Sequence, residues 1–231
     1  MVLRRFFLAL PVLLAVGGPV QAGDSATFVN LGFSADGSIY MFAQYGVRSP
    51  SLLPWADIFV VDVGNNDFVP GGRVSYTHDR PIVAGQSGSG AMHSLIARNA
   101  PLAERHGVTF PNQGQPLYIA LPGGPALVNG EISFRDFSTG VSYTARLVET
   151  VEGTGAGLRS SFRIDLSSTS PEGQVRHFTV GTPIWRPGIL AYRIRQVLIS
   201  PSATSMIFVI EMRQAAGNTH NIRYMVEAVR F

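Results

Sequence analysis

The segment Met206-Ile207-Phe208-Val209-Ile210-Glu211-Met212 decides the fold, because every residue in it except Glu211 is apolar. A strand with one buried face alternates apolar and polar residues, whereas a strand that is apolar on both faces has protein on both of its sides. The segment Ile58-Phe59-Val60-Val61-Asp62-Val63 has the same character, apart from Asp62. Both segments therefore predict strands inside a layered protein, as in a propeller blade or the middle of a sandwich.

Two stretches of the chain share a strand–turn–strand pattern. One is Phe33-Ser34-Ala35-Asp36-Gly37-Ser38-Ile39-Tyr40, and the other is Ile199-Ser200-Pro201-Ser202-Ala203-Thr204-Ser205-Met206. Apolar residues flank a short run of turn-forming residues in both, which predicts a tight reversal between adjacent antiparallel strands. We expect 34–37 and 200–204 to be equivalent turns. Each hairpin should also gain a third antiparallel strand, from 57–63 and from 222–231 respectively.

The rest of the chain also has the pattern of a mostly β protein. Runs rich in β-branched and aromatic residues are separated by Gly, Pro, Asn and Asp turns. These runs predict further strands at 27–33, 38–47, 68–69, 117–121, 130–137, 141–151, 160–166, 174–180 and 192–199. We predict a mainly β fold of antiparallel meander sheets, arranged either as propeller-like blades or as a β-sandwich.

One helical insertion near 90–106 interrupts the strands. Gly107 stands where a glycine commonly ends a helix, and Pro101 should kink the helix or divide it in two. The residues that fall on one apolar helical face are Met92, Leu95, Ile96 and Leu102. This face should pack inward, and His93 should be among the side chains left in water.

The N-terminus predicts export. Arg4 and Arg5 precede an apolar run at 6–16, and Val20-Gln21-Ala22 places short side chains before Gly23. Charge, apolar core and a small-residue end, in this order, are typical of a cleavable signal peptide. The apolar run is too short for a membrane-spanning helix, which needs about 20 residues. We predict cleavage between Ala22 and Gly23.

Residues 1–22 are therefore read as the signal peptide, and 23–231 as a single mostly β exported domain with no transmembrane segment after cleavage. The segment Arg4-Arg5-Phe6-Phe7-Leu8 also fits the core of a twin-arginine signal. The very short charged region in front of it favours ordinary secretion of the unfolded chain. Either route predicts a periplasmic or extracellular location.

The composition excludes several kinds of chemistry. The chain has no cysteine, so disulfides, thiol nucleophiles and cysteine-based metal sites are impossible. It has no lysine either, because all 18 basic residues are arginine, and this rules out Schiff-base catalysis and a phosphate-loop lysine. Removal of Arg4 and Arg5 brings the chain close to neutrality, which argues against nucleic-acid binding. We expect no cofactor.

Several of these segments resemble a family of bacterial predicted secreted proteins of unknown function. The resemblance is sharpest in Leu31-Gly32-Phe33-Ser34-Ala35-Asp36-Gly37, in 42–47, in 62–69, and from Ile199-Ser200-Pro201 to 222–227. It implies export and carries no site residues with it. The two strand–turn–strand stretches also resemble units of β-propeller blades.

Candidate catalytic residues are few. Tyr76-Thr77-His78-Asp79-Arg80-Pro81 is the densest polar cluster, and His78 and Asp79 are able to pair there if they lie in a turn rather than a strand. Glu211 and Glu227 interrupt apolar strands, and Arg213 or Arg223 is the expected partner of each. The five histidines show none of the spacings that hold a metal on a helix.

The sequence therefore favours an exported, non-enzymatic protein that binds another protein or a ligand of the cell envelope. The alternative is an exported hydrolase whose active site is assembled from distant segments, with His78 and Asp79 as the residues to test. A pocket with two titratable groups within hydrogen-bond reach would favour the enzyme. An exposed apolar or aromatic patch would favour the binding protein.

Overall fold

The computed structural model of the protein describes residues 23–121 and 130–231. Its strands form three antiparallel sheets, which we call the first, the outer and the central sheet. The first sheet has the order β4-β3-β2-β1-β5, with β1 Thr27–Ser34, β2 Ile39–Val47, β3 Pro54–Asp62, β4 Asp67–Thr77 and β5 Val108–Thr109. The outer sheet has the order β10-β9-β8-β7, with β7 Glu131–Arg135, β8 Ser142–Glu152, β9 Arg159–Thr169, β10 Val175–Val180, and β11 Arg186–Pro187 beside β9. The central sheet has the order β14-β13-β12-β6, with β6 Gln115–Ile119, β12 Ile189–Ile199, β13 Ser205–Ala216 and β14 Thr219–Arg230.

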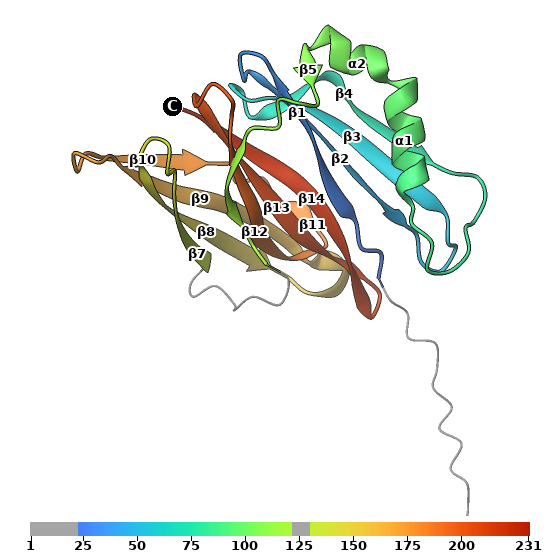
Figure 1. Cartoon of the computed structure of the whole chain (residues 1–231). Coiled ribbons are helices and arrows are strands. Elements are labelled where there is room, and N and C mark those ends of the chain that lie inside the picture. The colour runs from blue at the N-terminus through green and yellow to red at the C-terminus, as the bar shows by residue number, and fades with distance from the viewer. Residues whose placement is uncertain (1–22, 122–129) are drawn as a thin grey trace, which may run out of the picture.

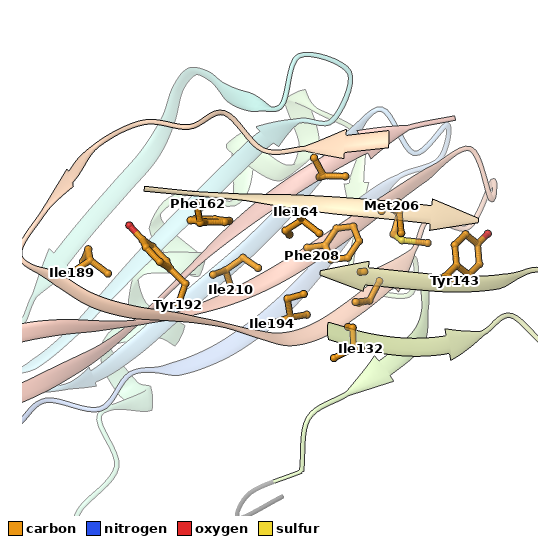
Figure 2. Packing of buried hydrophobic residues seen from close by; sticks show 14 residues of the cluster. Ile132, Tyr143, Phe162, Ile164, Ile189, Tyr192, Ile194, Met206, Phe208 and Ile210 are labelled. Carbon is orange, nitrogen blue, oxygen red and sulfur yellow. The ribbon is translucent and has the colours of Figure 1, made fainter. Parts of the chain in front are cut away.

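The central sheet lies between the other two, although most of its strands come last in the chain (Figure 1). Strand β13 shows why this sheet is central, because its two faces pack against different sheets. Phe208 and Ile210 belong to the buried cluster shared with the outer sheet, where Phe162 and Ile164 are their counterparts (Figure 2). All four side chains are at most 2% exposed.

The other face of β13 is equally buried. Ile207 and Val209 belong to the cluster shared with the first sheet, together with Phe42 and Phe59. The prediction of an interior strand with protein on both sides is therefore confirmed. The mainly β class is confirmed as well: each sheet contains a meander of consecutive antiparallel strands, and the sheets stack as in a sandwich.

Two helices cover the far face of the first sheet (Figure 1). They are α1 Ser89–Arg98 and α2 Ala100–Arg105, so the expected insertion is divided in two, with Pro101 in the first turn of α2. Met92 and Leu95 are buried in the cluster that contains Ile58 of β3, while His93 is exposed. The helix therefore packs the predicted face inward.

The two predicted turns are equivalent down to their hydrogen bonds. In the β1–β2 turn, the Gly37 N–H donates to the Ser34 carbonyl and the Ile39 N–H donates to the Ser34 hydroxyl, at 3.0 and 2.9 Å. In the β12–β13 turn, the Ala203 and Ser205 N–H groups contact the same two groups of Ser200, at 2.9 and 3.2 Å. Both hairpins gain the expected third antiparallel strand, β3 in one case and β14 in the other.

These two turns also contact each other. The Ser202 hydroxyl donates to the Asp36 carbonyl at 3.3 Å, and the Ser205 hydroxyl donates to the Gly37 carbonyl at 3.4 Å. Gly37 has a φ of +71°, and a Cβ on it would lie 2.7 Å from the Ser202 oxygen. Glycine is therefore required there by the backbone and by the close approach of the second turn.

The largest error of the sequence prediction concerns β4. The prediction ended this strand at 69, whereas it extends to Thr77. The predicted strand stops before Pro70, Gly71 and Gly72. In the structure β4 is an edge strand, where a proline needs no hydrogen-bond partner in the ladder. The register shifts between Phe59 and Val61 of β3, opposite these residues, so the glycines form an irregularity within a continuing strand.

The outer edge of β14 is covered by the N-terminal part of the chain. The Ile222 N–H donates to the Asp24 carbonyl at 2.8 Å, and the Tyr224 N–H donates to the Gln44 side chain at 2.9 Å. Further along the strand, the Ala228 N–H donates to the Asn66 side-chain oxygen at 2.6 Å. An unpaired strand edge invites pairing with another chain, and these contacts occupy it.

Candidate functional site

Glu227 is the centre of the candidate site. It lies on β14 and is only 4% exposed. The expected arginine partner, Arg223, is instead paired with Asp24, so that prediction is wrong. Glu211, the other acid in question, receives a hydrogen bond from the Tyr224 hydroxyl rather than from Arg213.

The true partners of Glu227 come from two distant segments. The Asn66 side-chain amide donates to Oε2 at 2.5 Å, and Arg186 Nη2 donates to Oε1 at 3.4 Å. Asn66 belongs to the turn between β3 and β4 and has a φ of +51°, a conformation that asparagine tolerates better than most residues. Arg186 begins β11, beside the outer sheet. The carboxylate thus joins elements from all three sheets.

Burial dominates the electrostatics of Glu227. Removal from water penalises the charged carboxylate and raises its pKa above the ordinary value of 4.5. The hydrogen bond from Asn66 and the charge of Arg186 oppose this rise without cancelling it. Glu227 therefore takes up a proton in the folded protein at a higher pH than it does in the unfolded chain.

A small cavity of about 110 Å³ opens beside this carboxylate, and we call it the Glu227 cleft. Its walls come from the β3–β4 turn, from β14 and from the segment that leads into β11. The lining residues are Val61, Asn66, Asp67, Phe68, Thr182, Ile184, Arg186, Met225, Val226 and Glu227.

The mouth of the cleft is apolar and exposed. Phe68 and Ile184 line it and are 37% and 55% exposed, and Trp185 follows in the chain with 39% exposure. Arginines lie over two of these rings: Arg73 over Phe68 at 5.1 Å and Arg159 over Trp185 at 4.8 Å. Such aromatic and arginine side chains are enriched where proteins bind partners.

The chemistry of the cleft suits binding better than catalysis. Each carboxylate oxygen of Glu227 has a hydrogen-bond donor within the protein, Asn66 for one and Arg186 for the other, so the carboxylate is held in place as part of the cleft wall. The cavity is also smaller than the roughly 300 Å³ at which small-molecule sites begin. It has room for the side chain of a bound partner.

His78 and Asp79 lie elsewhere, directly after β4, and the structure leaves them as untested candidates. His78 Nδ1 is 3.4 Å from the Asp79 carboxylate, which is close enough for an ion pair when the ring is protonated. The same Nδ1 lies 3.0 Å from the Arg80 N–H and 3.1 Å from the Arg80 carbonyl oxygen, and the tautomer of the ring decides which of the two contacts is a hydrogen bond. Asp79 is largely exposed, and neither residue lines the Glu227 cleft.

Sequence reasoning missed Asn66 and Arg186. Asn66 stands in the turn-forming run Gly64-Asn65-Asn66-Asp67, and Arg186 stands in Thr182-Pro183-Ile184-Trp185-Arg186, which predicts no regular element. The sequence feature that could have indicated this site is the apolar pair Ile184-Trp185 next to the cation Arg186. Large apolar side chains such as these are uncommon in loops. Within residues 23–121 and 130–231, no three acidic or histidine side chains are placed to hold a metal ion.

The stacked antiparallel sheets and the cleft with its buried carboxylate define a layered, mainly β protein. Residues 41–230 match the model of a family described as predicted secreted protein (DUF2259), and the chain belongs to that family. No curated protein matches it. The description of the family agrees with the exported location that the N-terminus predicts, and no helix in the described part of the chain has the length and hydropathy to span a membrane.

The raised pKa of Glu227 predicts an unusual dependence of stability on pH. The folded protein binds its proton more tightly than the unfolded chain does, so this group stabilises the fold as the pH falls through the raised pKa toward 4.5. The free energy of unfolding of the native protein should therefore rise, relative to that of Glu227→Gln, as the pH falls from about 8 to about 4. Urea titrations of both proteins at each pH measure this difference. A difference that is constant, or that falls with falling pH, contradicts the expectation.

Proposed function

We propose that the chain is an exported, non-catalytic binding protein of the cell envelope, and that the Glu227 cleft receives its partner. Residues 23–231 would act as one domain in the periplasm or outside the cell. The observation that carries the proposal is the small cavity with a buried carboxylate, which the exposed side chains of Phe68 and Ile184 line, with Trp185 next to Ile184 in the chain.

The partner proposed for the cleft is a protein segment with an apolar side chain. Ile184 and Phe68 provide apolar contact at the entrance, and a cavity of about 110 Å³ suits one inserted side chain. Trp185, the residue after Ile184 in the chain, stacks with Arg159, and tryptophan and arginine are enriched among the residues that carry binding energy. The alternative is an exported hydrolase that uses His78 and Asp79, and neither of these residues lines the Glu227 cleft.

A matched pair of substitutions tests this proposal. Ile184 lies at the cleft, and Val175 on β10 lies outside its lining with almost the same exposure, 55% against 54%. The tagged protein, its Ile184→Asp variant and its Val175→Asp variant are each crosslinked in intact cells and purified from the envelope fraction. The native protein and Val175→Asp should retain the same partner, and Ile184→Asp should lose it.

Two results would overturn the assignment. One is the same partner recovered with Ile184→Asp at the native level, which would place binding elsewhere. The other is hydrolytic activity of the purified protein that disappears in Asp79→Ala, which would favour the enzyme. Far-ultraviolet circular dichroism of the three proteins shows whether each is folded, so that loss of binding is distinguished from misfolding.

A further inference from the structure

A second cavity, of about 330 Å³, lies at another part of the molecule and differs in character from the Glu227 cleft. We call it the amide hollow. Its polar lining comes from the loop between β5 and β6, the turn after β7 and the start of the β12–β13 turn. These residues are Asn112, Gln113, Gln115, Asp136, Ser138 and Ser200.

The backbone of the loop is fixed, while its amide side chains are available. The Phe33 N–H donates to the Asn112 carbonyl at 2.7 Å, and the Asn30 side chain donates to the Gln113 carbonyl at 2.8 Å. Gly114 has a φ of +70°, and a Cβ there would lie 2.5 Å from the Ile199 carbonyl oxygen. Within the described residues, the side-chain amides of Asn112, Gln113 and Gln115 make no hydrogen bond, so their donors and acceptors are open to a ligand.

The hollow has no charged side chain that is free to pair with a ligand. Asp136 is its one acidic residue, and the carboxylate already accepts hydrogen bonds from Ser138 and Thr139. Burial alone would raise the pKa of Asp136, but these hydrogen bonds outweigh burial and hold the pKa below its ordinary value. No arginine or histidine lines the hollow. The ligand that fits is therefore a neutral one that both donates and accepts hydrogen bonds.

Two exposed phenylalanines are chain neighbours of the lining residues. Phe137 lies between Asp136 and Ser138 and is 88% exposed, and Phe110 lies before Pro111 and is 63% exposed. The face of an aromatic ring is electron-rich and attracts the slightly positive C–H groups of a sugar ring. A neutral sugar is bound by amide and hydroxyl groups, which contact its hydroxyls, and by aromatic faces, which contact its C–H groups. The hollow supplies the polar groups, and exposed aromatic rings follow or precede its lining residues in the chain.

We infer that the amide hollow binds a neutral oligosaccharide, through the side chains of Asn112, Gln113 and Gln115 and the rings of Phe110 and Phe137. A volume of about 330 Å³ falls within the range of small-molecule sites and suits one or two sugar rings. This site is separate from the Glu227 cleft, and it adds a ligand of the envelope to the protein partner proposed there.

Saturation-transfer NMR on the purified exported protein tests the inference. The probes are cellotriose, maltotriose and N,N′,N″-triacetylchitotriose, with trigalacturonic acid as the charged counterpart. At least one neutral probe should saturate below about 10 mM. Phe137→Ala and Gln113→Ala should each weaken this binding by about tenfold or more. Val175→Asp, at a residue that lines neither cavity, should leave it unchanged.

Three results would overturn the inference. They are no saturation with any neutral probe, binding that both hollow variants retain at the native affinity, and tighter binding of trigalacturonic acid than of the neutral probes. The hollow variants should keep the native unfolding midpoint in urea, because Phe137 is exposed and Gln113 uses only its backbone in the fold. If a hollow variant fails to fold, Phe110→Ala takes its place, because it removes the other exposed ring. Phe110→Ala should also weaken binding by about tenfold or more.

Discussion

Replacing Asp24 by alanine is expected to lower the free energy of unfolding by about 3–5 kcal/mol, which is typical of removing one member of a buried ion pair. Asp24 is buried, and its carboxylate lies 3.2 Å from Arg223 Nη2 and accepts the Ser49 N–H at 2.5 Å. The Arg223 guanidinium also stacks on Trp55, 4.4 Å from the ring centroid. Burial lowers the pKa of Arg223, and the neighbouring Asp24 is the main influence that opposes this. Without Asp24, an uncompensated charge stays buried.

Two further variants separate the causes of this loss. Asp24→Asn keeps an acceptor for the Ser49 N–H but removes the charge that faces Arg223, so its loss should be smaller than that of Asp24→Ala. Asp79→Ala serves as the matched control, because Asp79 is 83% exposed and should change stability by less than about 0.5 kcal/mol. Urea unfolding of the four proteins at neutral pH gives the values. Equal stability of Asp24→Ala and Asp79→Ala would show that the ion pair contributes nothing.

This expectation bears on export as well as on stability. Asp24 would be the second residue of the protein after cleavage at Gly23, and its backbone carbonyl accepts the Ile222 N–H of β14. The start of the predicted exported chain is therefore part of the packed structure. Cleavage a few residues downstream of Gly23 would remove the ion pair and the contact with the edge of β14.

The sequence was most informative where periodicity alone determines the structure. The alternation within β13 sends Phe208 to one sheet and Ile207 to the other, and the apolar character of both faces was enough to predict an interior strand. The two serine-containing turns were predicted from local composition. The local sequence pattern predicted the end of β4 wrongly, because Gly71 and Gly72 continue this edge strand rather than end it.

The partners of Glu227 could not be predicted from local sequence patterns. Asn66 is 161 residues away in the chain and Arg186 is 41 residues away, and only the stacking of the three sheets brings them together. Strand periodicity gives the face on which a side chain lies but not the register of one sheet against another. The nearby arginine, Arg223, was the obvious local choice, yet its partner comes from the other end of the chain.

The segments that resemble the secreted family meet in the structure. Asp36 and Gly37 of the first motif contact the Ser200–Ser205 turn of the last, and Asn66 contacts Glu227. Gln44 accepts the Tyr224 N–H further along β14, on the side of the Asn66 contact that faces away from the turns. The motif residues thus hold the first sheet against the central sheet. Asn66 and Glu227 also line the Glu227 cleft, so these residues combine a role in sheet packing with a place in the proposed binding site.

Replacing Phe208 by alanine tests this architecture at its centre and should cost about 3–5 kcal/mol, as large-to-small changes of buried aromatic residues do. The side chain is fully buried and packs with Phe162 and Ile164 of the outer sheet (Figure 2). Because β13 is paired on both sides, by β12 and by β14, its backbone has little freedom to move into the space left.

Phe137→Ala is the matched control for this substitution, since it removes the same atoms from a ring that is 88% exposed. It should change the free energy of unfolding by less than about 0.5 kcal/mol. Urea denaturation followed by tryptophan fluorescence and by circular dichroism measures both variants. The two probes should report one common transition for Phe208→Ala, because the cluster that it disrupts joins the outer and central sheets. A loss below about 1 kcal/mol would show that the central sheet is not packed on the outer sheet through this side chain.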